Sequence, residues 1–310
     1  MHPATASRAL DPARPGRVAP ATVRRVRAAA VTLGYRPDPA ARSLRTRRSG
    51  IVGVVVPDLT NPVVPPIVRG IERILWRAGL ACVLADTGED LQREAELIGE
   101  LRARRCEGLI VAPAARSSPG LDSIDIPTVL VLRGIDGGTL PLVAANDERG
   151  VRAAVAHLRG LGHKRIGHVT GPPSMSTTVR RLRAFQALTD GPAVLGEAFT
   201  VDAGALAAAR LLRRHPGTTA IIAGCDTVAL GCYVAISAAA LRCPDDVSVV
   251  GFNDIPLVDK VQPPLTTVAV PHYDLGQQAA RTLLARMRRD PAGSALLPAR
   301  LVVRDSTRAP

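Results

Sequence analysis

The sequence predicts an α/β protein built from two doubly wound parallel sheets, with a small helical segment at the N-terminus. From Ile51 onward, short apolar runs alternate with helical patterns, which is typical of parallel strands joined by crossover helices. Several runs are apolar almost throughout, as strands covered on both faces are. The runs are too many for one comfortable sheet, and 310 residues are enough for two such domains.

Eight runs are predicted strands, at residues 51–58, 81–87, 107–113, 128–133, 142–147, 165–171, 219–226 and 247–254. Helical patterns lie between them, at about residues 67–78, 89–104, 148–161, 176–189, 203–214, 227–241 and 273–289. Pro65 and Pro66 precede the first of these helices. Because proline inside a helix costs about 3 kcal/mol, we expect that helix to begin near Pro66.

Polar or turn residues end many of the strands: Asp58, Asp86, Pro113, Arg133, Asp147, Gly171, Asp226 and Asp254. In open α/β sheets, ligands bind at the carboxyl ends of the strands, and two such edges facing each other form a cleft. The set as a whole therefore predicts a ligand site. Taken singly, Asp147 and Asp226 are expected to cap the helices that follow them.

Residues 1–49 have a different character. A helix is predicted over residues 20–35, with Val23, Val26, Ala30 and Leu33 on one face and Gly34 at its end. Residues 36–49 begin as a short helix started by Asp38 and Pro39 and end as a basic linker.

Positive charge is concentrated in this N-terminal segment. Residues 1–49 hold eleven arginines against Asp11 and Asp38, a local charge of +9 out of +13 for the chain. A basic arm on a nearly neutral body favours a polyanionic partner, because phosphate contacts release counterions. A solvated basic tail is the other explanation for this charge.

Several other kinds of protein do not fit the sequence. The five cysteines are odd in number and scattered, which argues for free thiols rather than disulfides or zinc. His157, His163 and His168 have spacings typical of caps and core rather than of a metal site. Without a catalytic triad, paired carboxylates or a Gly-rich phosphate loop, we expect no enzymatic activity and no cofactor.

The hydropathy pattern predicts no membrane segment. The longest apolar run, at about residues 228–241, is shorter than the roughly 20 residues that a spanning helix needs. The N-terminal arginines are followed by no apolar stretch of the kind required for export. We therefore expect a cytoplasmic protein.

Five segments together resemble the LacI/GalR family of bacterial transcription regulators. They are LGYRPDPAARSLRTRRSGIVGVVVPDLTNP (33–62), GIERILWRAGL (70–80), AANDERGVRAAVAHLRGLGHKRIGHVTGP (144–172), DTVALG (226–231) and, within 247–268, VSVVGFNDIP with PPLTTV. The resemblance implies a periplasmic-binding-protein-like core behind a DNA-binding segment. It also implies a homodimeric repressor that binds a palindromic operator in double-stranded DNA and responds to a small-molecule effector.

The same resemblance implies how the N-terminal segment binds DNA. Residues 2–10 correspond to a recognition helix, and residues 39–45 to a hinge helix whose Leu44 wedges between base pairs in the minor groove. DNA contacts are expected at Thr5, Ser7, Arg8, Tyr35, Ala41, Leu44 and Arg45. The first helix of the family's helix-turn-helix has no counterpart, so we expect a start codon upstream of Met1. Residues 2–10 are too short to be helical in isolation.

The resemblance also divides the chain and suggests an effector site. Residues 1–49 form the headpiece and hinge, residues 50–146 with a return segment at about 272–292 the first core subdomain, and residues 147–271 with about 293–310 the second. Effector contacts are expected at Asn61, Arg181, Phe199, Cys225 and Asn253. Arg181 matches an arginine that binds hydroxyls or a carboxylate, and Phe199 an aromatic that packs on a sugar face.

Several pocket positions depart from the family pattern. Asn253 and Cys225 stand where an aspartate and an asparagine are usual, and Leu132 replaces a common acidic residue. These changes remove polar groups, so the effector is either a sugar or a smaller, less hydroxylated molecule. Two rival functions stay open at this point: a solute-binding protein for a transporter, and a ligand sensor that does not bind specific DNA.

Overall fold

The computed structural model describes residues 3–10, 17–35 and 49–310, without the side chains of Pro3 and Ser7. The chain divides into two compact units, Met1–Gly50 and Ile51–Pro310. In the first unit, α1 (Pro3–Leu10) packs against α2 (Pro20–Thr32), with Ala9 and Val26 buried. α1 has only 8 residues, and its packing against α2 provides the burial that an isolated short helix lacks. The predicted hinge over residues 39–45 lies outside the described residues.

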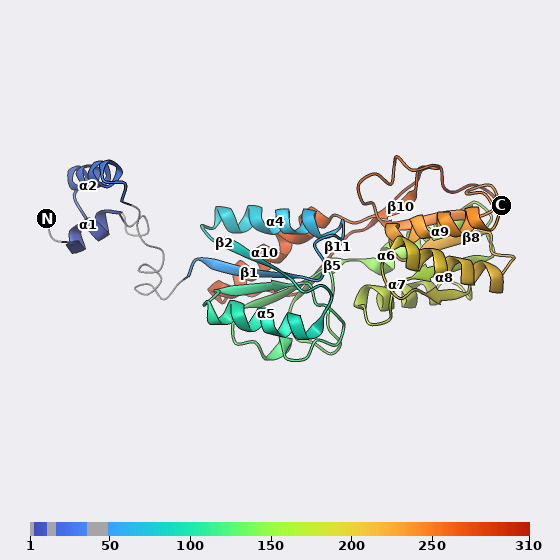
Figure 1. Cartoon of the computed structure of the whole chain (residues 1–310), viewed down its shortest axis with the longest axis horizontal. Coiled ribbons are helices and arrows are strands. Elements are labelled where there is room, and N and C mark those ends of the chain that lie inside the picture. Colours follow the sequence, from blue (N-terminus) through green and yellow to red (C-terminus); the bar gives the residue numbers. More distant parts are fainter. Residues whose placement is uncertain (1–2, 11–16, 36–48) are drawn as a thin grey trace. The chain divides into compact units, whose positions relative to one another are not determined.

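The second unit contains two sheets of six strands each (Figure 1). The first sheet has the order β11-β5-β4-β3-β1-β2, and all of its neighbouring strands are parallel. Its strands are β1 (Ile51–Val56), β2 (Ala81–Asp86), β3 (Gly108–Val111), β4 (Thr128–Val131), β5 (Leu142–Ala145) and β11 (Ala295–Leu297). Helices α4 (Val64–Arg77) and α10 (His272–Arg288) pack together on one face, and α5 (Leu91–Ala103) covers the other.

The second sheet has the order β12-β10-β9-β8-β6-β7, with only β12 antiparallel to its neighbour. Its strands are β6 (Ile166–Thr170), β7 (Ala193–Leu195), β8 (Ala220–Ala223), β9 (Ser248–Asn253), β10 (Thr266–Ala269) and β12 (Arg300–Val302). Helices α6 (Asp147–Gly160) and α7 (Ser176–Gln186) pack as one pair, and α8 (Val201–Arg214) and α9 (Asp226–Ala238) as another. A short 3₁₀ turn, Leu121–Ser123, precedes β4.

The predicted fold class is confirmed. All eight predicted strands are present, and β1, β3, β6, β8 and β9 are buried almost throughout, as expected for central strands of a covered sheet. The helix expected to begin near Pro66, α4, begins at Val64, two residues earlier. The N–H groups of a first helical turn have no partner inside the helix, so prolines there remove nothing that the helix uses.

Three chain segments connect the two sheets, which define two subdomains. The chain crosses between β5 and α6, between β10 and α10, and between β11 and β12. The predicted end of the return segment, at about residue 292, is too early. β11 pairs with β5 of the first sheet, so the chain crosses back only after Leu297.

The core contains buried polar groups as well as apolar ones. His168 stacks on Phe185 with ring centroids 5.0 Å apart, and His272 lies at the start of α10. All five cysteines are free, and Cys106, Cys225 and Cys232 are buried. Among the described residues, no helix is long and apolar enough to cross a membrane.

Acid is expected to destabilise the protein through His168 and His272. Burial lowers the pKa of His168 to about 4 and that of His272 to about 3, with the positive charge of Arg181 adding to both effects. Both histidines are neutral in the folded protein and ionise near pH 6.5 in the unfolded chain. Protonation therefore favours the unfolded chain, and the free energy of unfolding is unaffected above pH 6.5 and decreases as the pH falls below it. Between pH 7 and pH 5, each costs about 2 kcal/mol.

Urea unfolding of the wild type and of His272→Leu at both pH values measures this effect. The variant should lose about 2 kcal/mol less than the wild type on acidification. His215→Ala, at an exposed turn, is the control and should follow the wild type. An equal loss in the wild type and His272→Leu would show that His272 does not drive the acid sensitivity.

Candidate functional site

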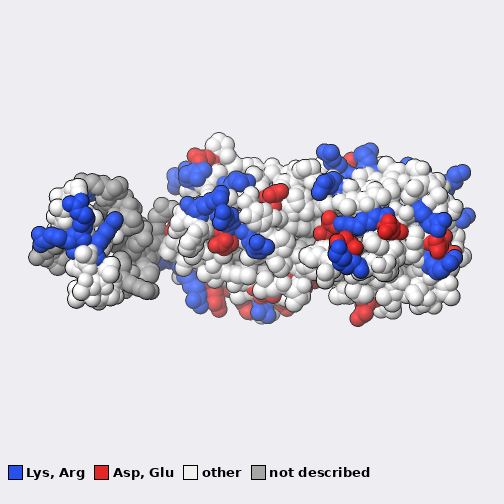
Figure 2. Space-filling view, turned by 90° about the horizontal axis from the view of Figure 1, so that it is seen from above, with Lys and Arg blue, Asp and Glu red and all other residues white. Residues whose placement is uncertain are grey.

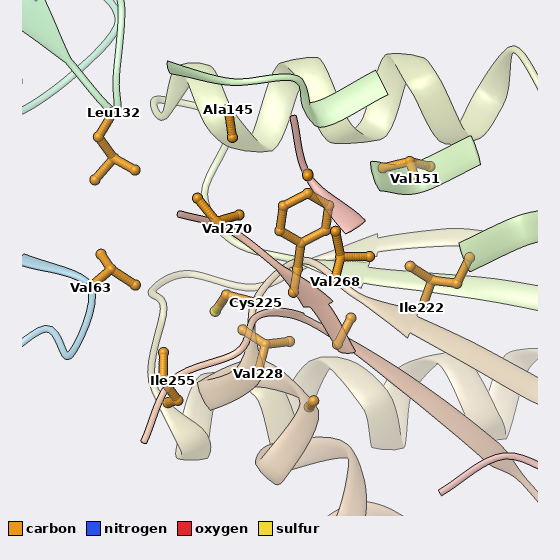
Figure 3. Packing of buried hydrophobic residues seen from close by; sticks show 14 of the residues in the cluster. Val63, Leu132, Ala145, Val151, Ile222, Cys225, Val228, Ile255, Val268 and Val270 are labelled. Carbon is orange, nitrogen blue, oxygen red and sulfur yellow. The ribbon is translucent and has the colours of Figure 1, made fainter. Parts of the chain in front are cut away.

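A pocket lies between the two subdomains, at the carboxyl ends of their strands. It is lined by Asn61, Pro62, Val63, Leu132, Arg133, Thr177, Arg181, Phe199, Cys225, Thr227, Asn253 and Ile255. The five predicted effector residues are all in this set. Figure 3 shows apolar parts of the wall, with Val63 and Leu132 from the first subdomain and Cys225 and Ile255 from the second. The structure therefore brings the five predicted residues together, although Asn61 and Asn253 are 192 positions apart in the sequence.

Arg181 is fixed in the wall by groups on three sides. Its Nε donates to Asp147 Oδ1 at 2.9 Å, its Nη1 donates to the Gly224 carbonyl oxygen, and its guanidinium lies 3.7 Å from the centroid of the Phe252 ring. Asp147 is buried and also accepts a bond from Arg180 Nε at 2.7 Å. One buried carboxylate thus holds two arginines.

The capping roles expected for Asp147 and Asp226 are wrong. Each is the first residue of its helix, and the preceding residues, Asn146 and Cys225, occupy the N-cap positions. Asp226 instead accepts bonds from the Ile255 N–H at 2.8 Å and from the Thr267 hydroxyl at 2.5 Å. Burial raises the pKa of Asp226 to about 6. Both aspartates are therefore tied to distant segments rather than to their own helices.

Arg133 is a pocket residue that was predicted only as one of the strand-end residues and not as an effector contact. It lies two residues after the end of β4 and is only 3% exposed, and its Nη2 donates to Glu89 Oε1 at 2.8 Å. Its guanidinium carbon lies 5.9 Å from the centroid of the Phe199 ring. The available signal was its place at the carboxyl end of a predicted strand.

Three hydrogen bonds join the subdomains in front of the pocket. The Gly134 N–H donates to Ser176 Oγ at 2.9 Å, Arg180 Nη2 to the Leu132 carbonyl at 3.1 Å, and the Arg116 N–H to the Ser174 carbonyl at 2.8 Å. All three involve the segment that leads into α7 or its first turns. The helix that carries Arg181, α7, is therefore bonded to the first subdomain near its start.

The remaining predicted residues offer mixed chemistry. Asn61 Oδ1 accepts from the Val63 N–H at 3.2 Å, which fixes the loop before α4. Cys225 Sγ lies 3.0 Å from the Thr227 hydroxyl, and burial raises the pKa of this thiol, so it stays neutral. Asn253 has a φ of 121° and ends β9 at the pocket. The polar lining thus consists of amides, hydroxyls, a thiol and two guanidinium groups.

The described part of the first unit is uniformly basic. It carries Arg8, Arg17, Arg24, Arg25 and Arg27 and, within residues 3–10 and 17–35, no Asp or Glu. Figure 2 shows these side chains as a blue group without red atoms among them. Of the predicted DNA contacts, Arg8 and Tyr35 are exposed and Thr5 is partly buried. The side chain of Ser7, together with Ala41, Leu44 and Arg45, lies outside the described parts of the structure.

Comparisons with known proteins agree with this architecture. The family model of the periplasmic binding protein-like domain matches residues 155–307. The chain is 32% identical to the ribose operon repressor of Halalkalibacterium halodurans, over 98% of this chain and 93% of that protein. It is 33% identical to the transcriptional repressor CytR of Escherichia coli (99% and 93%) and 35% identical to the regulator MalR of Streptomyces coelicolor (98% and 92%).

Solved structures give the same result. A lac repressor dimer bound to operator and the anti-inducer ONPF superposes with a TM-score of 0.88 at 26% identity, covering 99% of this chain and 95% of that one. A LacI family regulator from Enterococcus faecium with bound ribose gives 0.74 at 29% identity, covering 84% and 99%. The relatives are named as repressors and regulators rather than enzymes. This chain belongs to the LacI family of transcription regulators.

Proposed function

We propose that this chain is a cytoplasmic, homodimeric repressor that binds a palindromic DNA operator through its N-terminal unit. A small-molecule effector, with a sugar as one option, binds in the pocket between the core subdomains and controls the affinity for DNA. The observation that carries this proposal is the pocket itself. Asn61, Arg181, Phe199, Cys225 and Asn253 all line one space between the subdomains of a LacI family chain.

The connections between the subdomains supply a way to couple the pocket to DNA. Three crossing segments allow one subdomain to rotate against the other, and the hydrogen bonds from Gly134, Arg180 and Arg116 stabilise the orientation of this structure. A ligand that touches both walls would favour one orientation over another. The shift in DNA affinity can be no larger than the ligand's preference for that orientation.

An exposed apolar surface supports a homodimer. It consists of Trp76 at the end of α4, Val83 and Leu84 on the edge strand β2, and Leu91 at the start of α5, and Trp76 is 72% exposed. β2 has a single neighbour in its sheet, β1. An apolar edge strand with one free side invites pairing or coverage by another chain.

Selection from a random pool of double-stranded DNA by the purified chain tests the proposal. The expected product is an inverted repeat, since a two-fold dimer reads two half-sites. Its affinity should fall steeply with salt, by roughly 10³- to 10⁵-fold between 50 and 200 mM if six to ten phosphates are contacted. Leu44→Ala should weaken binding to the selected repeat more than binding to unrelated DNA.

Arg152→Ala is the matched control, since Arg152 is an exposed residue in an ion pair with Glu148, and it should bind like the wild type. Selection of sequences without symmetry, bound with no dependence on salt, would contradict the proposal. That result would favour a ligand sensor that does not bind specific DNA.

A further inference from the structure

We propose that the effector of this chain carries an oxyanion, a carboxylate or a phosphate, that binds to Arg133 in the pocket. The inference rests on the proposed effector site and specifies the chemistry of its ligand. It follows from one unpartnered buried cationic group, from the charge balance of the pocket wall and from the way the backbone fixes Arg133.

The guanidinium of Arg133 is buried but only partly satisfied. Nη2 forms an ion pair with Glu89, whereas Nη1 is buried and has no hydrogen-bond partner among the described residues. Leaving a buried charged donor without an acceptor is unfavourable, and the cost disappears when an acceptor arrives. Because Arg133 lines the pocket, a ligand oxygen is the group in a position to supply that acceptor.

The pocket wall carries an excess of positive charge. Its lining contains two arginines, Arg133 and Arg181, and no Asp or Glu. The carboxylates that pair with them, Glu89 and Asp147, lie behind the lining, and Asp147 is shared with Arg180. The buried carboxylate of Glu94 also interacts with the charge of Arg133 from behind the lining. The surface that a ligand meets therefore presents guanidinium groups and no carboxylate, which favours a negatively charged ligand over a neutral one at this low-dielectric site.

The backbone holds Arg133 in place. Leu132 has a φ of 66°, in the left-handed region, and the Arg133 N–H donates to the Val131 carbonyl at 2.6 Å in a tight turn. The next residue, Gly134, bonds to Ser176 across the subdomains. A strained conformation that is held from both sides often marks a functional position. Here it turns Arg133, two residues after β4, into the pocket wall, beside the ring of Phe199.

Matched pairs of ligands test the proposal by calorimetry on the full chain. Glucose is compared with gluconate and glucose 6-phosphate, ribose with ribose 5-phosphate, and inorganic phosphate and acetate with chloride at equal ionic strength. At least one anion should bind at least about tenfold more tightly than its neutral partner, because hydrogen bonds to charged groups are the strong ones. The gluconate and phosphate arms show which oxyanion is preferred.

Variants link the binding to the named side chain. Arg133→Gln should weaken the anion by about 10- to 100-fold and leave any neutral ligand within twofold. Arg133→Lys keeps the positive charge but loses the planar, bidentate guanidinium, so its affinity for the anion should lie between those of the wild type and Arg133→Gln. Arg102→Gln, in the surface ion pair with Asp125, is the control and should behave as the wild type. Circular dichroism verifies that each variant is folded.

Two results would overturn the inference. In the first, neutral sugars bind as well as their anions and still change DNA affinity, so the proposed function stands while the ligand is not an anion. In the second, no anion, inorganic phosphate included, shows an effect that depends on Arg133. Failure of the proposed function looks different, because the selected DNA would then lack an inverted repeat whatever the ligand.

Discussion

Replacing Asp147 by alanine is expected to lower the free energy of unfolding by about 3 to 5 kcal/mol. Asp147 is 3% exposed and accepts bonds from Arg180 and Arg181 at 2.7 and 2.9 Å. Without it, Arg181 stays buried with no carboxylate to balance its charge, and breaking a buried pair from one side is more costly than removing both partners. Denaturant unfolding at pH 7 measures the change.

The matched control is the neighbouring residue. Glu148→Ala breaks an exposed pair with Arg152 at 2.7 Å, and surface pairs contribute about 0 to 1 kcal/mol. Ligand binding provides a second readout, because Arg181 released from Asp147 no longer keeps its place in the pocket wall. A loss for Asp147→Ala no larger than that for Glu148→Ala would mean that the buried pair does not stabilise the fold.

Replacing Gly276 by alanine is expected to destabilise the protein by about 3 kcal/mol. Gly276 lies in α10 where that helix crosses α4, and a Cβ atom there would stand 2.0 Å from the Ile67 carbonyl oxygen. Gly70 of α4 faces α10 in the same way, 2.1 Å from the Tyr273 carbonyl oxygen. Since the obstacles are backbone atoms, the whole helices would have to move apart and loosen the buried residues beneath them.

Gly99 provides an informative control. It also lies inside a helix, α5, but a Cβ atom there meets nothing within 4 Å. Gly99→Ala should therefore stabilise the protein by up to about 1 kcal/mol, because alanine favours helix more than glycine does. Thermal unfolding of the two variants should give shifts of opposite sign. Equal shifts would show that the close crossing of α4 and α10 does not restrict residue 276.

Some of the candidate site could be predicted from sequence. The strand-end residues identified the edge of each sheet where a pocket belongs, and the resemblance to LacI/GalR regulators selected Asn61, Arg181, Phe199, Cys225 and Asn253. The structure brings all five to one pocket. Their roles in binding stay a prediction, as do those of Thr5, Arg8 and Tyr35 toward DNA.

The place of Arg133 in the pocket wall could not be predicted from the sequence. It was recognised as the end of a predicted strand, but nothing local indicates which way the residue after a strand turns. The direction depends on the left-handed backbone at Leu132 and on the bond from Gly134 to Ser176, 42 residues away. The capping roles predicted for Asp147 and Asp226 were wrong for a related reason. The local pattern predicts helix caps, whereas their partners are residues such as Arg181 and Thr267, 34 and 41 residues away.

The sequence by itself determined the elements that carry a long or strongly apolar pattern. The eight main strands, the helices between them and the basic N-terminal unit all follow from residue spacing and charge, because these preferences act between near neighbours. β7, β11 and β12 have three residues each, too few for a pattern, and each pairs with one neighbouring strand at the edge of its sheet. Only the tertiary structure decided these edges, the crossing after Leu297 and the partners of the buried charges. Each depends on which distant backbone or side chain comes within bonding distance once the chain has folded.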